Sequence, residues 1–415
     1  MKPPYRLADP LREEAFAKLR RDAIFDCCKW DPQVGDVAVL APAPLILEAG
    51  AWRMLARWSE QLATETLAAE AALAQQPALH PTLGLPRVLR RALTAAAGVA
   101  SADAVPGSRI MRFDFHFTAE GWRISEVNAD VPGGLNEAEG FTALMQRHHP
   151  RLGVAPGVAT ALARAVLRTT NPGAPVGLVH ATAYSDDRQV MAYLGRAIEI
   201  AGGRVEYLAP DHVAWREGRA FVDAAWSTEE LGAIVRFYPA EWMPALPRAT
   251  AWGNFFAPTR TPQTNPATAL LPQSKRFPLV WDELPVDLPA WRALLPATAD
   301  PRSVDLADET WVLKPAWGRI GEDIGMSGVT PPADLKKIRR AARWHASQWV
   351  AQRRFTCMPV SDGEHPWHPC LGVYVVNGTA CGLYGRMAQA PLINARALDV
   401  AVLIEENDSV PEIPT

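Results

Sequence analysis

Charged and amide side chains are concentrated in one short stretch of β-like pattern, RIMRFDFHFTAEGWRISEVNAD at residues 109–130. In a strand over 109–117, Arg112 and Asp114 alternate with apolar residues and are expected on one face. In a strand over 122–130, the same alternation assigns one face to Trp122, Ile124, Glu126, Asn128 and Asp130. Carboxylate and amide oxygens are hard ligands that suit Mg²⁺, an ion that also shares phosphate oxygens. Asp114, Glu126 and Asn128 are therefore the candidate metal ligands.

The turn between the two strands decides whether these polar groups meet. Thr-Ala-Glu-Gly at 118–121 predicts a three-residue loop that ends with Gly121 in the left-handed region. In that register Asp114 faces Glu126 and Arg112 faces Asn128. Opposed Cβ atoms lie about 4.5–5.5 Å apart, so the two carboxylates would repel each other unless a cation lies between them. The alternative is a solvated sheet face on which Arg112 screens the two acids.

A second stretch, LKPAWGRIGEDIG at 313–325, has residue types that suit a polyphosphate. Lys314 ends a predicted strand, Gly318, Gly321 and Gly325 let the backbone approach phosphates closely, and Arg319 adds charge. The alternative is an ordinary turn after a solvent-exposed lysine. The P-loop pattern GxxxxGK[ST] is absent from the sequence, so the P-loop class of nucleotide-binding protein is unsupported.

Lysine is scarce in this chain, which contains seven lysines among its 42 basic residues. Lys275 (in LPQSKRFPLVW) and Lys314 are retained in segments of strand-like pattern flanked by proline, where the compact ammonium group is of interest. Two further polar residues are placed at strand ends, Gln352 in SQWVAQRRF and Arg386 in GLYGRM.

The spacing of apolar residues predicts the elements that must hold these side chains. Helices are expected over 10–30 and 51–100, and again within 136–168. Strand, helix and strand follow over 174–182, 186–203 and 204–210, a βαβ unit of Rossmann-like type without the GxGxxG pattern. A strand over 309–317, a helix over 333–346, a strand over 348–355 and a hairpin that turns at Asn377-Gly378 complete the chain.

Composition restricts the class of protein. The 415 residues are 48% hydrophobic and 21% charged, with a net charge of −3, so no global field favours nucleic acid or an anionic membrane. No apolar run approaches the roughly 18 residues of a spanning helix, and the first residues lack the apolar core of a secretory signal. Five cysteines without CxxC spacing argue against a disulfide framework or a zinc site and predict a cytoplasmic protein.

The order of these motifs resembles the glutathionylspermidine synthase family. The shared order is R-x-D, G-x-x-x-x-E-x-N-A-D-x-P, S-K, L-K-P-x-x-G-R-x-G, a glutamine-bearing strand and G-L-x-x-R, over about residues 105–400. The resemblance implies a permuted ATP-grasp carboxylate–amine ligase, corresponding to the synthetase module alone. The implied fold class is α/β (α+β): an ATP-grasp fold with a Rossmann-like pre-ATP-grasp domain and an N-terminal helical region.

The resemblance also implies a role for each matching residue. Two Mg²⁺ ions would be bound by Asp114, Glu126 and Asn128, while Arg112 would hold the substrate carboxylate or acyl phosphate. ATP would be contacted by Lys275, Lys314, Gly318, Arg319, Gly321 and Gln352, with Gln352 in the strand that borders adenine. Arg386 would support the transferring phosphate or the tetrahedral intermediate.

The identity of the substrates stays open at this point. The loop reads Gly-Arg-Ile-Gly where the family often has Gly-Arg-Glu-Gly, and Val131–Asn136 also departs from the usual run. The expected partners are a small carboxylate and an amine, with peptides and polyamines among the candidates. Neither nucleic acid nor a membrane is expected as a partner. A homodimer is compatible with the sequence. Asp186, Asp187, Glu137 and Glu139 are candidates for a polyamine pocket, or else cap helices or lie on the surface. The alternatives are ligation of a different acid–amine pair and nucleotide binding without ligase activity.

Five segments are expected along the chain. They are a mainly helical region at 1–105, the hairpin with the following helices of the ATP-grasp core at 106–172, the Rossmann-like pre-ATP-grasp domain at 173–265, the nucleotide-binding lid at 266–366 and the C-terminal return to the core at 367–415.

Overall fold

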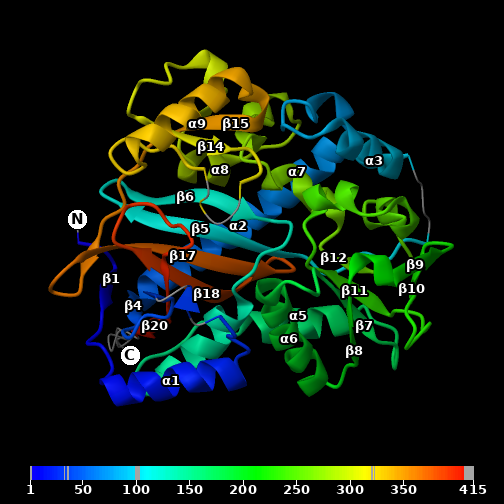
Figure 1. Cartoon of the computed structure of the whole chain (residues 1–415), viewed down its shortest axis with the longest axis horizontal. Coiled ribbons are helices and arrows are strands. Elements are labelled where there is room, and N and C mark those ends of the chain that lie inside the picture. Colours follow the sequence, from blue (N-terminus) through cyan, green and yellow to red (C-terminus); the bar gives the residue numbers. More distant parts are fainter. Residues whose placement is uncertain are drawn as a thin grey trace, which may run out of the picture.

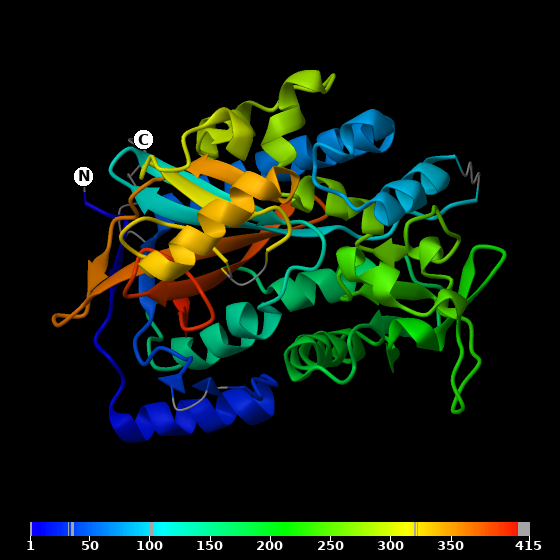
Figure 2. The same cartoon turned by 45° about the horizontal axis from the view of Figure 1, so that its top comes forward.

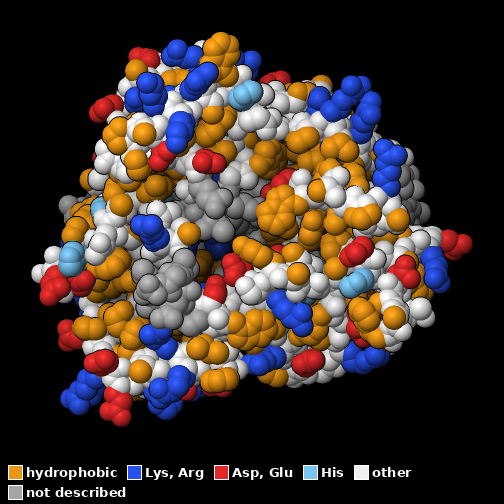
Figure 3. All heavy atoms as spheres, viewed as in Figure 1, with side chains coloured by type: hydrophobic (Ala, Val, Ile, Leu, Met, Phe, Trp, Pro, Cys, Tyr) orange, Lys and Arg blue, Asp and Glu red, His pale blue; other side chains and the backbone are white. Residues whose placement is uncertain are grey.

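The computed structural model describes residues 2–31, 33–34, 37–98, 103–318, 321 and 323–405. Figures 1 and 2 show a mixed α/β molecule in which a central sheet lies between a helix-covered lobe at the top and a parallel-sheet lobe at the right. Among the described residues, no helix is both long and apolar enough to cross a membrane. Acidic and basic side chains are interspersed over the face in Figure 3, in keeping with the small net charge.

The central sheet brings together two hairpins that are far apart in the sequence. Its described strands run in the order β19-β18-β17-β5-β6, and a short strand, β16, pairs with β17. Their bounds are β5 Ile110–Thr118, β6 Gly121–Asn128, β16 Val360–Ser361, β17 Pro366–Val376, β18 Thr379–Ala388 and β19 Leu398–Val400. The hairpin predicted to turn at Asn377-Gly378 is confirmed, and both turn residues have positive φ, 48° and 83°. Phe113 and Phe115 are fully buried on the core side of β5.

The first hairpin has the expected residue pairs, but its turn and its register differ from the prediction. Thr118 pairs with Gly121, so the turn contains two residues, and the predicted three-residue loop is wrong although Gly121 does have a φ of 101°. Between Phe115↔Ile124 and Asp114↔Glu126 the register shifts, because Ser125 is an extra residue that forms a β-bulge. Beyond the bulge, Asp114 faces Glu126 and Arg112 faces Asn128, as predicted.

The bulge also reverses which residues of β6 face the core. Trp122 and Ile124 are buried before it, and Val127 is buried after it. The prediction that Trp122 and Ile124 share a face with Glu126 and Asn128 is therefore wrong. A single extra residue moves every later side chain to the opposite face, since the side-chain period of a strand is two.

The right-hand lobe contains the predicted Rossmann-like unit. A parallel sheet in the order β12-β11-β7-β8 is formed by β7 Val176–Val179, β8 Val205–Leu208, β11 Ala233–Arg236 and β12 Gln263–Thr264. Helices α5 (Val158–Leu167) and α6 (Ser185–Ile200) pack beside it, and α6 connects β7 to β8. The strand–helix–strand prediction is confirmed.

The upper lobe carries the predicted lysine strand. β13 (Thr298–Ala299), β15 (Trp349–Arg353) and β14 (Trp311–Pro315) form an antiparallel sheet in that order, and α9 (Pro332–Trp344) covers it. Lys314 lies in β14 as expected. Lys275 instead lies in a turn between α7 (Leu270–Gln273) and the 3₁₀ helix η8 (Phe277–Glu283), so its predicted strand context is wrong.

The N-terminal region contains the expected helices and a small sheet that was not predicted. The helices are α1 Glu13–Asp26, α2 Ala49–Ala74 and α3 Arg87–Ala97, and the sheet pairs β1 (Tyr5–Leu7) and β20 (Val402–Glu405) with β4 (Leu45–Glu48). Helix α2 packs its buried face against the core side of the central sheet.

The other strands and α-helices are β2 Gln33–Val34, β3 Val37–Ala38, α4 Thr142–Gln146, β9 Val213–Arg216, β10 Arg219–Val222 and α8 Pro289–Leu294. The π-helix is η2 Asn136–Phe141, and the remaining 3₁₀ helices are η1 Pro77–Leu79, η3 Pro210–His212, η4 Ala240–Ala245, η5 Arg248–Thr250, η6 Trp252–Phe255, η7 Ala267–Ala269, η9 Pro301–Ser303 and η10 Ala346–Gln348.

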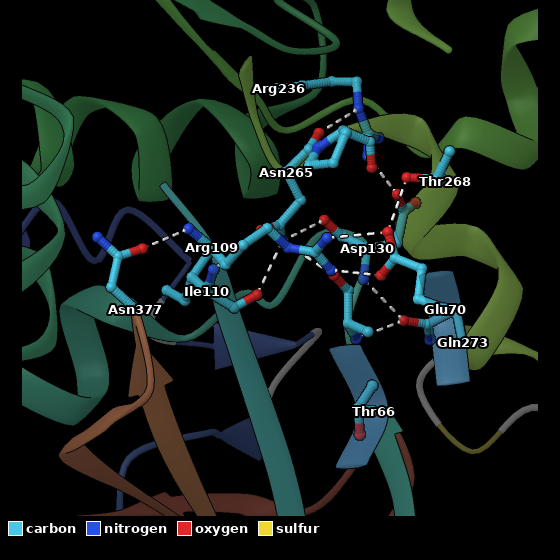
Figure 4. A network of polar contacts seen from close by, with 12 residues as sticks. Thr66, Glu70, Arg109, Ile110, Asp130, Arg236, Asn265, Thr268, Gln273 and Asn377 are labelled. Carbon is cyan, nitrogen blue, oxygen red and sulfur yellow. Dashed lines mark hydrogen bonds and ion pairs between the residues drawn. The ribbon is translucent and has the colours of Figure 1, made fainter. Parts of the chain in front are cut away.

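Buried polar contacts fix the open end of the first hairpin (Figure 4). The Asn265 amide accepts the Ile110 N–H at 2.9 Å and donates to the Ile110, Ala129 and Asp130 carbonyls at 2.8–3.0 Å. It therefore links the start of β5 to the chain just beyond β6. The Asp130 carboxylate, fully buried, forms an ion pair with the fully buried Arg236 of β11 and accepts the Ala240 N–H at 3.0 Å. The central sheet is thus linked to the parallel sheet at the hairpin end.

We expect Asp130→Asn to lower the free energy of unfolding by about 3–5 kcal/mol, because it leaves the Arg236 guanidinium buried without its counter-charge. Urea unfolding followed by tryptophan fluorescence measures the change. The matched control is Asp103→Asn, since the side chain of Asp103 is 65% exposed in its ion pair with Arg260; its expected loss is below about 1 kcal/mol. Equal losses in the two variants would contradict this account.

Candidate functional site

A cleft of about 620 Å³ lies where the central sheet, the upper lobe and the parallel-sheet lobe meet. In Figure 3 the face is hollowed near its centre, and side chains of both charges are visible there. The described residues to which the family resemblance assigns a role all line this cleft: Arg112, Asp114, Glu126, Asn128, Lys275, Lys314, Gly318, Gly321, Gln352 and Arg386. Gly325, the third glycine of the predicted polyphosphate loop, is not among the lining residues. Arg319 lies outside the described residues. The structure thus brings together groups from five separate parts of the chain.

The two carboxylates of the hairpin are each paired with a cation. Asp114 accepts from Arg112 Nε at 2.7 Å and from Arg112 Nη2 at 3.0 Å, and its Oδ2 also accepts from Asn128 Nδ2 at 3.1 Å. Glu126 Oε2 lies 3.0 Å from Lys275 Nζ. Burial would raise the pKa of Glu126, but Lys275 and Lys314 outweigh it and lower this pKa to about 2. Both acids are therefore held by protein cations, as the screening alternative supposed for Arg112.

The donor set of this face suits magnesium when phosphate supplies further ligands. Within the described part of the chain, no group of three or more His, Cys, Asp or Glu residues is arranged to hold a metal. Mg²⁺ commonly uses only one or two carboxylates and completes its shell with water and phosphate oxygens. Two carboxylates and one amide on the same face of the hairpin fit that pattern, with Asp114, Glu126 and Asn128 as the residues that would hold the ion.

The two cleft lysines come from the upper lobe and the turn beneath it. Lys314 Nζ donates to Gln352 Oε1 at 2.7 Å and to the carbonyl of the bulge residue Ser125 at 3.3 Å. Lys275 Nζ donates to the Gly318 carbonyl at 2.6 Å, so it contacts both the glycine loop and Glu126. Burial, with a further contribution from Lys275, lowers the pKa of Lys314 to about 8 even though Glu126 opposes that shift. Phosphate oxygens could replace the neutral carbonyl partners of both ammonium groups.

The glycine loop approaches the chain closely at Gly321. Its φ is 68°, and a Cβ at this position would lie 2.1 Å from the Ile393 carbonyl oxygen. Any larger residue would therefore displace the loop from this segment. The predicted conformational need for glycine is confirmed at this position.

The two arginines occupy one wall of the cleft. The Arg112 guanidinium carbon lies 5.1 Å from the Tyr384 ring centre and 5.9 Å from that of Tyr374, and Nη1 donates to the Gly133 carbonyl at 2.9 Å. Arg386 Nη2 donates to the Asn394 carbonyl at 2.7 Å. The wall can therefore present two fixed guanidinium groups to a carboxylate or a phosphoryl group.

Sequence reasoning missed other residues of the cleft. His116 packs against Phe355 with ring centroids 5.1 Å apart, and its Nε2 lies 3.1 Å from Ser125 Oγ. Burial and the nearby Lys314 lower the pKa of His116 to about 4, so the ring is neutral at pH 7. Its position on the same face of β5 as Arg112 and Asp114 was the one available signal. Gln273 was also missed; its Oε1 accepts the Ala129 and Asp130 N–H groups at 2.7 and 3.0 Å.

The acidic candidates for a polyamine pocket divide into three groups. Asp186 and Asp187, in the first turn of α6, line the cleft from the parallel-sheet lobe. Glu139 instead accepts the Ala159 and Thr160 N–H groups at 2.6 and 3.1 Å at the start of α5, so the helix-cap alternative is correct for it. Glu137 lines the cleft and forms a 2.6 Å ion pair with Lys29.

Comparison with solved structures shows a fold shared with synthetase-like proteins. A glutathione synthetase-like effector from Globodera pallida, in its apo form, is similar with a TM-score of 0.65 and 11% identity, covering 94% of this chain and 97% of that one. A putative gamma-glutamylcysteine synthetase from Methylobacillus flagellatus has a TM-score of 0.40 and 12% identity, covering 84% and 90%, which is too low to support an argument. No curated protein matches the sequence significantly.

The sequence matches a family over most of its length. Residues 47–405 match the family described as glutathionylspermidine synthase pre-ATP-grasp. This match and the structural likeness confirm the ATP-grasp fold class, and the family supports a ligase-type function that uses ATP. The chain therefore belongs to the glutathionylspermidine synthase family.

Proposed function

We propose that the protein is an ATP-dependent carboxylate–amine ligase that forms an amide through an acyl phosphate, releasing ADP and phosphate. One observation carries the proposal. In a chain of this family, a single cleft combines the Asp114–Glu126 pair with two lysines and two arginines from distant segments. Opposite charges in this arrangement can bind a polyphosphate together with its metal and hold a carboxylate nearby.

The chemistry requires activation of the acid. A carboxylate is a poor acyl donor at neutral pH, so its oxygen attacks the γ-phosphorus of ATP and ADP leaves. The amine then attacks the acyl carbon, loses a proton, and phosphate leaves from the tetrahedral intermediate. Bound Mg²⁺ would supply charge neutralisation at the phosphates, held by Asp114, Glu126 and Asn128; two such ions are expected from the family.

The protein's own cations would position the reacting groups. Lys275 and Lys314 would contact the phosphates, with Gly318, Gly321 and Arg319 in the loop beside them and Gln352 near the base. Arg112 would hold the substrate carboxylate, and Arg386 would stabilise the transferring phosphoryl group. When phosphate arrives, Lys275 can exchange Glu126 for a phosphate oxygen, which frees the carboxylate for the metal. The ion pairs of Arg112 with Asp114 and of Lys275 with Glu126 thus keep these charges compensated until they meet the acid, the metal and the phosphates.

The end of the cleft that the parallel-sheet lobe lines suits an amine. Asp186 and Asp187 line it, and so do the aromatic residues Tyr184 and Trp242, from the segments that follow β7 and β11. Carboxylates and aromatic faces both favour a cationic group. This end is where we place the acceptor amine.

A second candidate, ligation of a different acid–amine pair, is favoured by the segment Val131–Asn136. Its sequence departs from the family, and its Gly133 carbonyl accepts from both Arg112 and Tyr374. Arg112 is the residue proposed to bind the substrate carboxylate, so a change in this segment alters the contacts around the acid. The proposal therefore covers amide formation as a class and assigns neither glutathione nor spermidine.

The ligase proposal predicts that ADP is released only when a suitable acid and amine are both present with MgATP. Panels of acids and amines, analysed by mass spectrometry for amide products, identify the pair. Lys314→Ala and Glu126→Ala should each lower the rate by at least about 100-fold, because each removes charge stabilisation of the phosphoryl transfer. The control is Lys337→Ala, since the Lys337 side chain is 78% exposed. Full activity in either cleft variant, or nucleotide binding without turnover on any panel, would contradict the proposal.

The lowered pKa of Lys314 gives a second prediction. In metal-free protein without nucleotide, its acylation rate should rise through a midpoint near pH 8, because the neutral amine is the reactive form and dominates above its pKa. The exposed Lys18 is the reference lysine in the same sample. Peptide mass spectrometry at each pH measures both lysines. Bound MgATP should suppress the reaction at Lys314 alone. A midpoint for Lys314 far above pH 8 would contradict the lowered pKa, and a lack of protection would argue against Lys314 as a phosphate contact.

A further inference from the structure

Lys29 lies in the cleft although it precedes the matched residues 47–405. Its Nζ lies 2.6 Å from Glu137 Oε1 and 3.2 Å from both Asp31 Oδ1 and Asp399 Oδ2. The Lys29 side chain is only 6% exposed. Burial would lower the pKa of this amine, but the three carboxylates raise it well above its ordinary value. Lys29 therefore places a permanent positive charge at the floor of the cleft.

The end of α1 aims Lys29 at this position. Helix α1 ends at Asp26, Cys28 has a left-handed φ of 56°, and the Lys29 N–H donates to the Ala23 carbonyl at 3.0 Å. Cys27 packs against Gly140 of η2, where an added Cβ would lie 2.8 Å from the sulfur. This contact joins the end of α1 to the helix that carries Glu137. The ion pair between Lys29 and Glu137 therefore lies between two packed elements rather than on a mobile surface.

Asp399 lies between Lys29 and Arg386 and interacts with both. Asp399 and Arg386 are direct cross-strand partners in β19 and β18, and Arg386 Nε lies 3.9 Å from Asp399 Oδ1. The N-terminal segment also fixes the backbone of Asp399, which accepts the Ala41 N–H at 2.8 Å and donates to the Val39 carbonyl at 2.6 Å. Lys29 on one oxygen of Asp399 leaves the other oxygen directed toward Arg386 and Tyr384.

Tyr384 extends the same contacts to Arg112. Its hydroxyl donates to Asp399 Oδ1 at 2.7 Å, and its ring faces the Arg112 guanidinium at 5.1 Å. Without Lys29, the negative charges of the buried carboxylates of Glu137 and Asp399 would no longer be balanced by a nearby ammonium group. Asp399 would then pair more closely with Arg386, which now lies 3.9 Å away. This change would move a guanidinium group of the cleft wall.

We propose that Lys29 is a positioning residue for Arg386 and Arg112. The segment before residues 47–405 therefore contributes to the function of the site. Lys29 acts through Asp399 and Tyr384. The inference rests on the proposed function in one respect, that Arg386 contacts the third phosphate of the nucleotide. Its signature is selective: Lys29 should affect that phosphate without affecting the rest of the nucleotide.

Calorimetric titration with MgADP and with the slowly hydrolysed analogue MgATPγS tests this selectivity. Wild-type protein should bind the analogue more tightly than MgADP. Lys29→Met, which keeps side-chain length but removes the charge, should lose about 10-fold of that preference, the size of effect typical of outer-shell partners, while the Kd of MgADP stays within about 2-fold. Lys29→Arg should recover part of the preference. Lys18→Met, on the exposed face of α1 with 68% side-chain exposure, should behave as wild type.

Asp399→Asn provides an independent test should Lys29→Met fail to fold. It removes the charge beside Arg386 while keeping an acceptor for Tyr384, and it should show the same selective loss. An unchanged preference in the folded variants, or an equal loss for both nucleotides, would overturn the positioning role while leaving the ligase proposal intact. Failure of the wild-type protein to bind either nucleotide would instead overturn the proposed function, and this inference with it.

Discussion

The buried ion pair between Asp130 and Arg236 is the constraint on which the site depends. It joins the chain just beyond β6 to the last residue of β11 in the parallel sheet, and Asn265 holds that point against the start of β5. With its open end fixed, the hairpin must accommodate Ser125 as a bulge between that end and the turn. The bulge directs Glu126 into the cleft beside Asp114. A contact that takes no part in chemistry thus sets the geometry of the proposed metal ligands.

Charge balance is the second organising feature of the cleft. Asp114 is paired with Arg112, Glu126 with Lys275, and Asp399 with Lys29. These pairs compensate the buried charges, and in the proposed reaction the first two exchange partners with a metal nucleotide and an acid. The exchange keeps opposite charges together throughout, so no buried charge is left uncompensated. The pairs of Lys29 with Glu137 and Asp399 differ, because neither carboxylate is a proposed metal ligand and both pairs can stay intact.

Much of the arrangement could be predicted from local pattern. The period of two in β5, the strand end at Lys314 and the turn at Asn377-Gly378 are all local signals, and each identified its element. The bulge at Ser125 carries no such signal, so the correct facing of Asp114 and Glu126 was predicted from an incorrect loop length. The contacts of Lys29 with Glu137 and Asp399 span 108 and 370 residues of sequence. Only tertiary packing brings such groups together, and periodicity contains no information about it.

The central claim is that the polar face of β5 and β6 is the metal and phosphate platform. A crystal structure with Mn²⁺ in place of Mg²⁺ and ATPγS in place of ATP tests it most directly. The anomalous signal of manganese locates the metal. The account predicts manganese bound between the phosphates and Asp114, Glu126 and Asn128, with Lys275 moved from Glu126 to a phosphate oxygen. Manganese bound away from these side chains, with the Lys275–Glu126 pair intact beneath a bound nucleotide, would contradict it.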